Sequence, residues 1–306
     1  MKTMRFAEYG DPSVLTYQDV EQPVPGPGQV RIKVTATSFN GVDANIRAGY
    51  MQGPIPVTLP HTPGSDVAGT VDALGDGVDG FAAGDAVIGF LGLLPVGASA
   101  QYVLAPADIL TAAPTSIPLA DAAALPVVGL TAWQALFEHA KLTTGQRVLI
   151  NGAGGAVGDY AVQLAKSAGA YVIGVAGPRS ADRVQSAGAD EVLAGSPDGV
   201  TEPVDVVLNF AAVAPEQLAA LVPLIRDGGV LVNTTVWMPA PSDETRGVRG
   251  INLFVRSDAA QLAGLVARVD AGELRVEVAR RVPLSDLPAV HAEPGAVSGK
   301  TVITVA

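Results

Sequence analysis

The chain has 306 residues, of which 48% are hydrophobic and 16% charged, a composition suited to two packed domains and not to a disordered chain. Its formal net charge of −11 argues against nucleic acid and anionic membranes as partners, although an anionic cofactor can still bind in a local basic pocket. The absence of cysteine excludes disulfides, thiolate zinc sites and a cysteine nucleophile. No apolar stretch reaches membrane-spanning length and no secretory signal is visible, so we expect a soluble, cytoplasmic protein.

The first part of the sequence is rich in strand and turn signals. Residues 29–36 alternate apolar and polar side chains, which is the period of a half-buried strand, and the preceding PGPG predicts a turn. Further strand candidates are residues 66–74, 86–90 and 100–105, separated by glycine-rich segments. Short strands joined by such turns predict a small β-barrel.

From Leu119 the pattern changes to alternating helices and strands. Residues 120–140 are predicted to be helical, with interruptions near Pro126 and Gly129. Six strand candidates follow, with helical segments between most of them: 147–151, 171–176, 190–193, 204–208, 229–235 and 251–255. Six strands with crossovers make a complete doubly wound parallel sheet, an α/β fold. A helix at 259–271 and a strand at 300–305 follow, and we expect that strand to return to the first domain.

Residues 147–158 read RVLINGAGGAVG, a short apolar strand that ends in a glycine cluster, and the next twelve residues have helical spacing. This order is a variant of the dinucleotide-binding fingerprint, whose glycines permit a tight turn, close approach of a pyrophosphate and close packing of helix on strand. The helix N-terminus adds free N–H groups. The predicted loop comprises Gly152, Ala153, Gly154, Gly155, Ala156, Val157 and Gly158. The alternative is an ordinary tight turn, which the complete strand-helix-strand context disfavours.

The segment after the next strand favours NADPH over NADH. An NAD site usually carries an acidic residue there, about 20 residues beyond the glycines, to bind the ribose 2′-hydroxyl. This sequence has Gly177, Arg179 and Ser180 instead, and a guanidinium with a hydroxyl suits a 2′-phosphate. The alternative is that Arg179 is a solvated loop residue.

The order of these motifs resembles the medium-chain dehydrogenase/reductase superfamily and, within it, the zinc-independent quinone oxidoreductases. The resemblance rests on the glycine-rich β domain, GLTAW at 129–133, NGAGGAVG at 151–158 and GADEVL at 188–193, and it covers nearly the whole chain. It implies a GroES-like catalytic domain formed by residues 1–119 and 257–306, a Rossmann NADP(H)-binding domain formed by residues 120–256, and commonly a homodimer.

Zinc-dependent members of this superfamily bind a catalytic metal through a Cys of the first domain, a His in a GHE motif and a further Cys or acidic residue. Here Asn40 stands in the place of the first ligand, Gly64-Ser65-Asp66 replaces the GHE motif, and the lobe with four cysteines is missing. The histidines, His61, His139 and His291, share no ligand spacing. We therefore predict no metal site.

The resemblance also implies candidate catalytic residues. Asn40 and Asp43 match an NxxD segment whose Asn lies near the nicotinamide, and Thr131 matches a residue beside the nicotinamide or its phosphate. The family often carries a Tyr two residues after that Asp, where this sequence has Asn45, with Tyr50 nearby. In the alternative interpretation, Asn40 caps a turn and Asp43 orders the loop.

Further cofactor contacts are expected at the ends of later strands. Asn209 ends one strand at the edge of the sheet where ligands bind. By the resemblance, Phe254 and Val255 flank the nicotinamide, although Phe254 suits a core position equally well. Residues 90–96 are a candidate pocket lining or core segment, and residues 236–250 a candidate lid or plain surface connection.

Without a metal or a thiol, the chemistry must come from the cofactor, while the protein supplies position and electrostatics. Hydride transfer from NADPH to a small apolar quinone or α,β-unsaturated carbonyl asks least of the protein. It needs only a donor such as Asn40, Tyr50, a backbone N–H or water to stabilise the charge on the acceptor oxygen. Oxidation of a plain alcohol needs a Lewis acid or strong base. The alternatives are an enoyl-thioester reductase and a non-catalytic NADPH-binding redox sensor.

Overall fold

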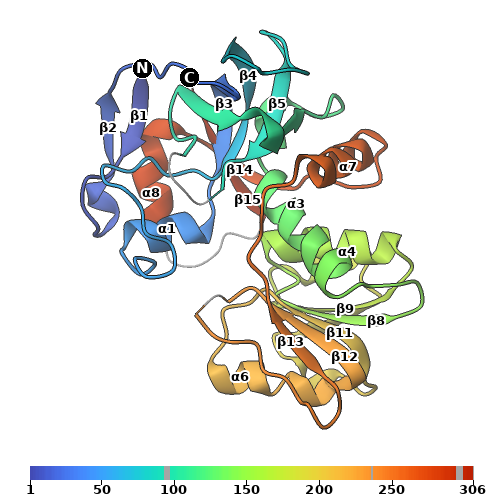
Figure 1. Cartoon of the computed structure of the whole chain (residues 1–306). Helices are drawn as coiled ribbons and strands as arrows, with labels where there is room; N and C mark the ends of the chain where they lie inside the picture. The colour runs from blue at the N-terminus through green and yellow to red at the C-terminus, as the bar shows by residue number, and fades with distance from the viewer. Residues whose placement is uncertain (93–96, 236, 294–298, 306) are drawn as a thin grey trace. The chain divides into compact units, whose positions relative to one another are not determined.

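A computed structural model describes residues 1–92, 97–235, 237–293 and 299–305, and it divides into two compact units (Figure 1). The first unit comprises Met1–Val127 and Arg256–Ala306, and the second comprises Val128–Val255. The boundaries expected from the sequence lie after residues 119 and 256.

The first unit is built on a seven-stranded, mainly antiparallel sheet with the order β14-β15-β3-β4-β5-β7, in which β6 also pairs with β3. Val30, Ile32 and Val34 of β3 are buried in its core, as the alternating pattern predicts. The strands are β3 (Gln29–Ser38), β4 (Asp66–Leu74), β5 (Ala86–Phe90), β6 (Tyr102–Pro106), β7 (Leu110–Ala112), β14 (Val278–Pro283) and β15 (Lys300–Thr304), with a separate pair, β1 (Lys2–Arg5) and β2 (Thr16–Asp19).

Short helices join these strands and pack on them. The chain ends by adding β15 antiparallel to β3, so the predicted return of the terminal strand to the first domain is confirmed. Helix α2 packs on β3, β4 and β15, and α7 packs on β7. The helices are η1 (Pro12–Val14), α1 (Gly41–Arg47), η2 (Ala107–Ile109), α2 (Leu119–Ala122), α7 (Ala259–Asp270), η6 (Leu284–Asp286) and α8 (Leu287–Ala292).

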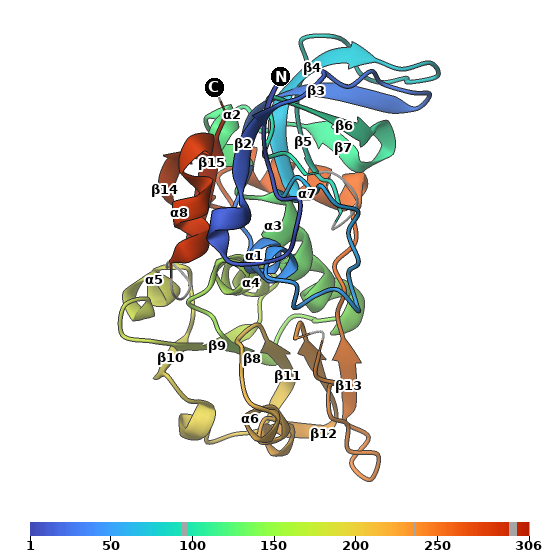
Figure 2. The same ribbon diagram turned by 90° about the vertical axis from the view of Figure 1, so that its left-hand side faces the viewer.

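The second unit holds a six-stranded parallel sheet with the order β10-β9-β8-β11-β12-β13, which is the Rossmann order. The strands are β8 (Arg147–Asn151), β9 (Tyr171–Ala176), β10 (Glu191–Ala194), β11 (Val204–Asn209), β12 (Ile225–Asn233) and β13 (Arg249–Asn252). Figure 2 shows α4 (Ala156–Ser167) and α6 (Pro215–Ala219) on opposite faces of this sheet. The other short helices are α5 (Ala181–Ser186), η4 (Pro197–Gly199) and η5 (Val222–Leu224). The predicted doubly wound α/β fold is confirmed.

The predicted helical segment 120–140 differs in detail from the structure. It is divided into α2, α3 (Pro126–Trp133) and a π-helical segment η3 (Gln134–His139). The break precedes Pro126, which opens α3, because the first helical position needs no N–H donor. The interruption expected at Gly129 is wrong: this glycine is buried inside α3, and packing outweighs its helix-propensity cost of about 1 kcal/mol. Among the described residues, no helix is both long and apolar enough to cross a membrane.

Candidate functional site

The predicted pyrophosphate loop is a tight turn between β8 and α4. Gly152 has a φ of +87°, a conformation that favours glycine. A Cβ on Gly158 would lie 2.3 Å from the carbonyl oxygen of Gly152, and a Cβ on Gly154 would lie 2.1 Å from Oγ of Ser180. Both contacts are closer than real atoms approach, so the turn requires glycine at these positions and presents bare backbone.

The first turn of α4 supplies the donors that a phosphate needs. Its N-cap is Gly155, which has no side chain to cap the helix, so the N–H groups of the first turn, beginning at Ala156 and Val157, have no intrahelical partner. The turn itself is fixed, because the Ala153 N–H donates to Val175 O at 3.0 Å. A glycine cradle in front of an uncapped helix fits the pyrophosphate of a dinucleotide.

The loop between β9 and α5 carries the residues expected near the 2′-phosphate. Ser180 Oγ donates to Gly177 O at 3.2 Å and packs against Gly154. The Arg179 side chain is exposed, and the described residues give its guanidinium no hydrogen-bond or ion-pair partner. Arg183, which sequence reasoning missed, donates from Nη2 to Gly154 O. Its signal was a second arginine four residues after the first, in PRSADR.

Four asparagines form a row along the carboxyl edge of the parallel sheet. Asn151, Asn209, Asn233 and Asn252 end the adjacent strands β8, β11, β12 and β13 and are cross-strand partners in register. Asn151 Nδ2 donates to Asn209 Oδ1 at 2.8 Å, and Asn209 Nδ2 donates to Asn233 Oδ1 at 2.9 Å. Asn233 Nδ2 then donates to Met238 O at 3.0 Å, in the turn after β12.

This row shows what Asn209 does in the protein. Its side chain is 0% exposed, and both polar atoms of its amide are occupied, because Nδ2 also donates to Ala211 O at 3.2 Å. Sequence reasoning placed Asn209 at the carboxyl edge of the sheet, where the structure has it, and missed Asn151, Asn233 and Asn252. The signal was available, since the segments RVLIN, VDVVLN, VLVN and RGIN all end in Asn.

Other expected cofactor contacts lie on or beside this sheet. Thr131 is buried in α3. Phe254 is 57% exposed after β13, which removes the alternative of a plain core residue, and Val255 beside it is half-buried. Sequence reasoning missed Trp237, which is 60% exposed in the turn that Asn233 holds. The second unit thus presents two large aromatic side chains after neighbouring strand ends.

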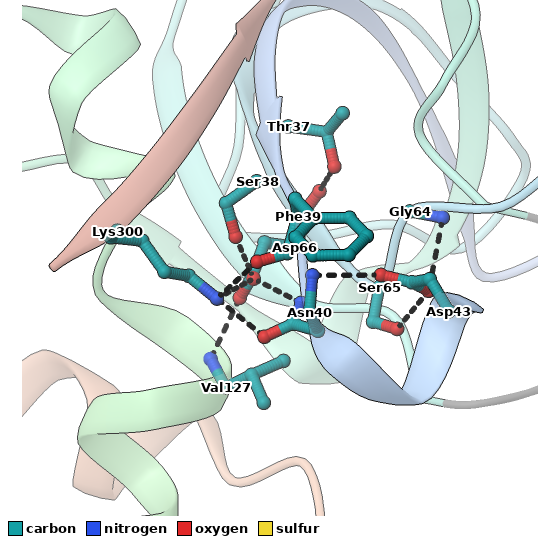
Figure 3. Close-up of polar contacts among 10 residues, drawn as sticks. All are labelled: Thr37, Ser38, Phe39, Asn40, Asp43, Gly64, Ser65, Asp66, Val127 and Lys300. Atoms are coloured by element: carbon teal, nitrogen blue, oxygen red, sulfur yellow. Dashed lines mark hydrogen bonds and ion pairs between the residues drawn. The ribbon is translucent and has the colours of Figure 1, made fainter. Parts of the chain in front are cut away.

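In the first unit, a buried polar cluster surrounds Asn40 (Figure 3). Lys300 from β15 is 3% exposed; its Nζ donates to Asn40 Oδ1 and, at 3.1 Å, to Phe39 O, and it lies 3.6 Å from Asp66 Oδ2. Asn40 Nδ2 donates to the same Asp66 oxygen at 2.9 Å. Oδ2 of Asp66 also accepts from Ser38, and its Oδ1 accepts from the Val127 N–H at 2.7 Å.

Asp43 lies beside this cluster and orders the loops around it. Its carboxylate accepts from the N–H of Asn40 at 3.1 Å, from the N–H of Gly64 at 3.4 Å and from Ser65 Oγ at 3.3 Å (Figure 3). Burial raises the pKa of Asp43 to about 6, against hydrogen bonds that lower it. Burial also lowers the pKa of Lys300, opposed by Asp66 and Asp43. These hydrogen bonds support the alternative interpretation, in which Asp43 orders the loop.

Comparison with known proteins assigns this architecture to a family. Residues 26–115 match the family model for the alcohol dehydrogenase GroES-like domain, and residues 187–303 match that for zinc-binding dehydrogenases. A chloroplast envelope quinone oxidoreductase homolog of Arabidopsis thaliana is 33% identical over 324 residues, covering 99% of this chain and 98% of that protein. The quinone oxidoreductase of Mus musculus is 33% identical over 98% of this chain and 96% of its own length. The chain belongs to the quinone oxidoreductases of the medium-chain dehydrogenase/reductase superfamily.

Solved structures agree with this assignment. The quinone oxidoreductase from Coxiella burnetii superposes with a TM-score of 0.90 at 29% identity, covering 100% of this chain and 99% of that chain. An NAD-dependent alcohol dehydrogenase gives a TM-score of 0.91 at 28% identity, with 100% of both chains covered. The chain is thus an oxidoreductase with a GroES-like unit and a Rossmann unit, in a family that binds a nicotinamide cofactor.

Sequence reasoning also named Tyr50 and the histidines His61 and His291. Tyr50 is 79% exposed in the turn that follows α1. His61 and His291 are buried edge-on against Phe6 and Phe39, at centroid distances of 5.3 and 5.0 Å. Burial lowers the pKa of His291 to about 3. The described residues contain no group of three His, Asp or Glu side chains arranged to hold a metal.

The structure describes only part of residues 90–96, the candidate pocket lining or core segment, and of residues 236–250, the candidate lid or surface connection. Residues 93–96 of the candidate pocket segment lie outside the described residues, while Phe90 is core and Leu91 lines a cavity of about 490 Å³ in the first unit. Residue 236 of the candidate lid also lies outside them. The rest of that loop is braced by a bridge between Asp243 and Val248 and by Arg246, whose Nε donates to Asp227 Oδ1 at 2.8 Å.

Proposed function

We propose that this protein uses NADPH to reduce a quinone or an α,β-unsaturated carbonyl by hydride transfer, without a metal. The observation that carries the proposal is the Lys300 cluster. Asn40 stands in the place of the first metal ligand of zinc-dependent relatives, and Asp66 in the motif that replaces GHE, next to Ser65 in the place of the ligand His. The oxygens of Asn40 and Asp66 lie against the buried ammonium group of Lys300. Because an ammonium group of the chain itself lies in this place, the reaction should be one that needs no metal ion as a Lewis acid, such as reduction of a conjugated acceptor. The quinone oxidoreductases that match along the whole chain support the acceptor class.

The Rossmann unit would hold the cofactor, whose nicotinamide supplies the hydride when bound. The glycine turn from Gly152 to Gly158 and the open first turn of α4 bind the pyrophosphate. Arg179 and Ser180 bind the 2′-phosphate, which favours NADPH over NADH. The exposed guanidinium of Arg179 supports this role, since within the described part of the chain it makes no hydrogen bond or ion pair that turning toward a phosphate would break. Thr131, Phe254 and Val255 contact the nicotinamide.

Asn40 is the donor to the acceptor oxygen in this proposal. A primary amide has two N–H bonds, and Asp66 accepts one of them. The other is left for the oxygen on which negative charge develops. Tyr50, the other candidate donor, is 79% exposed, whereas Asn40 is buried among polar partners, so Asn40 fits the role better. Asp43 fixes the backbone on which Asn40 stands.

We further infer a homodimer, with no nucleic acid or membrane partner, working in the cytoplasm. Strand β13 ends the parallel sheet in the described order, and an edge strand is a ready site for pairing with a second copy. Light scattering on the purified protein tests this: a monomer mass at working concentration would reject it.

An enoyl-thioester substrate is a second candidate acceptor, since it too has a conjugated carbonyl. A structure described as CurK enoyl reductase superposes with a TM-score of 0.83 at 25% identity, covering 100% of this chain and 99% of that chain. The charge on the acceptor oxygen would again fall to Asn40.

A panel of acceptors tests the proposed function. NADPH oxidation is followed spectroscopically with para-quinones, α,β-unsaturated aldehydes and an enoyl-CoA, with NADH in parallel. We expect turnover with quinones or enals. Turnover with the enoyl-CoA alone would select the thioester reaction. Tight NADPH binding without turnover of any acceptor would support the redox sensor and reject the enzyme.

A further inference from the structure

Lys300 is a charged residue that sequence reasoning left without a role. It lies at the start of β15, 260 residues along the chain from Asn40, and its side chain is 3% exposed. An ammonium group out of water costs several kcal/mol unless it is paired and hydrogen-bonded. Such a costly group needs a structural or a functional explanation.

The partners of Lys300 are arranged around a single amide. The ammonium reaches Asn40 Oδ1, the neighbouring carbonyl of Phe39, and Asp66 (Figure 3). Asp66 accepts from Asn40 Nδ2, so cation and carboxylate hold the two ends of the same side chain. The Asn40 side chain is therefore fixed in rotamer and in amide orientation.

One N–H of the Asn40 amide has no acceptor within this cluster. The ammonium donates hydrogen bonds to Asn40 and Phe39 and forms an ion pair with Asp66 at 3.6 Å. Asp66 accepts from Ser38 and Asn40 at Oδ2 and from the Val127 N–H at Oδ1, so both of its oxygens are hydrogen-bonded. Only the second N–H of Asn40 has no acceptor in this cluster. This N–H is therefore available to a ligand.

We propose that Lys300 is a positioning residue that orients and polarises the Asn40 amide, so that its free N–H binds the carbonyl oxygen of the acceptor. The inference rests on the proposed function. A cation on the amide oxygen draws electron density from the amide and makes the opposite N–H a stronger donor, as in other hydrogen-bonded chains at low dielectric. The benefit grows as negative charge develops on the acceptor oxygen, so it belongs to the transition state.

A double-mutant cycle between Lys300 and Asn40 tests this role. Lys300→Met, Asn40→Ala and the combined variant are assayed for kcat and KM with the best acceptor of the panel. Because Lys300→Met alone strands Asp66 as an unpaired buried carboxylate, the neutral pair Lys300→Met/Asp66→Asn is made as well. Lys2→Met is the matched control, since it removes a lysine whose pairing with Asp19 is exposed.

We expect Lys300→Met to lower kcat roughly 10-fold or more, with little change in the KM for NADPH. The loss should persist in Lys300→Met/Asp66→Asn, because the cation is still missing, and should largely vanish when Asn40 is already Ala. Lys2→Met should behave as wild type.

Two results would overturn the role of Lys300 while leaving the proposed function intact. One is a Lys300→Met loss of the same size with and without Asn40. The other is wild-type kcat in the neutral pair, which would show that Lys300 only balances the charge of Asp66. A wild-type protein inert toward every acceptor would instead reject the proposed function, and the role of Lys300 with it.

Discussion

Asn151 donates a 2.8 Å hydrogen bond from Nδ2 to Oδ1 of Asn209, across the pair of strands at which the order of the parallel sheet reverses. Ligands of open α/β sheets bind at this reversal. Asn209 passes the connection to Asn233, so side-chain amides link the strand before the glycine turn to the turn that carries Trp237. We interpret the row as a brace that fixes the binding edge of the sheet.

Replacing Asn209 with Leu should destabilise the protein by about 1–3 kcal/mol. It leaves the buried Asn151 Nδ2 without its partner and removes one of the two hydrogen bonds that Asn233 Oδ1 accepts, the other coming from the Thr235 N–H. Urea denaturation measures the loss. Asn252→Leu is the control, since Asn252 is exposed and accepts one bond, from the Ala240 N–H at 2.8 Å. Its cost should stay below about 1 kcal/mol. Equal costs for both variants would contradict the brace.

Two neighbouring arginines should affect cofactor binding differently. Arg179→Ala should weaken NADPH binding by about 1.5–3 kcal/mol, roughly 10- to 100-fold, and leave NADH nearly unchanged, because only NADPH carries the 2′-phosphate. Arg183→Ala should weaken both cofactors, since Arg183 holds the Gly154 carbonyl in the turn common to both sites. Fluorescence titration with each cofactor gives the affinities. Equal losses of both cofactors in Arg179→Ala would reject its role.

The glycines of the turn should not tolerate even a methyl group. In Gly158→Ala the new Cβ meets the Gly152 carbonyl at 2.3 Å, and backbone must move, so we expect a cost of about 1–3 kcal/mol and weaker binding of both cofactors. Gly264→Ala is the control, because its Cβ would have nothing within 4 Å and it lies in α7 of the first unit, away from the glycine turn in sequence. Thermal unfolding and cofactor titration compare the two. Wild-type behaviour of Gly158→Ala would mean that the turn has another conformation.

The ionisation of Asp43 should make the folded protein less stable as the pH rises, which is the opposite of the effect of a carboxylate whose pKa is lowered by folding. Burial raises its pKa to about 6 in the folded protein, above the value of 3.8 for a free side chain, so the folded state binds the proton more tightly. Its contribution is fully present below about pH 4 and is lost as the pH rises to about 6, a change of about 3 kcal/mol.

The comparison with Asp43→Asn isolates this effect, because the other carboxylates cancel in the difference. From about pH 4 to about pH 6, the stability of the wild type should fall relative to Asp43→Asn in urea denaturation. Asp190→Asn is the control of opposite sign. Folding lowers the pKa of Asp190. Burial alone would raise this pKa, but the hydrogen bonds from Lys166 and the Val172 N–H outweigh burial and lower it. Parallel profiles for the wild type and Asp43→Asn would contradict the raised pKa.

The sequence predicted the local parts of the fold well. Strands β4, β5, β8 and β9 have the predicted ends, because apolar runs and glycine boundaries are signals within a few residues. Strand β12 begins at Ile225, before the predicted residue 229. Asp227-Gly228-Gly229 has the composition of a turn, but Gly228, with φ +77°, lies where the register with β11 shifts.

The candidate site was predictable only where its residues are close in sequence. The glycine turn and the Arg179 segment have local patterns, so the sequence could name both as candidates. Lys300 and Asn40 are 260 residues apart in the sequence and meet because β15 pairs with β3. No sequence pattern near either residue indicates this contact. The repeated Asn at strand ends was visible in the sequence, but its meaning depends on the strand order.

The most direct test of the account is NADPH oxidation by chelator-treated protein of known metal content, with a para-quinone and with an α,β-unsaturated aldehyde. We predict acceptor-dependent oxidation of NADPH that chelation leaves unchanged, faster than with NADH, in protein without stoichiometric zinc by elemental analysis. Activity that disappears on chelation and returns with zinc would contradict the account, as would firm NADPH binding with no turnover of either acceptor.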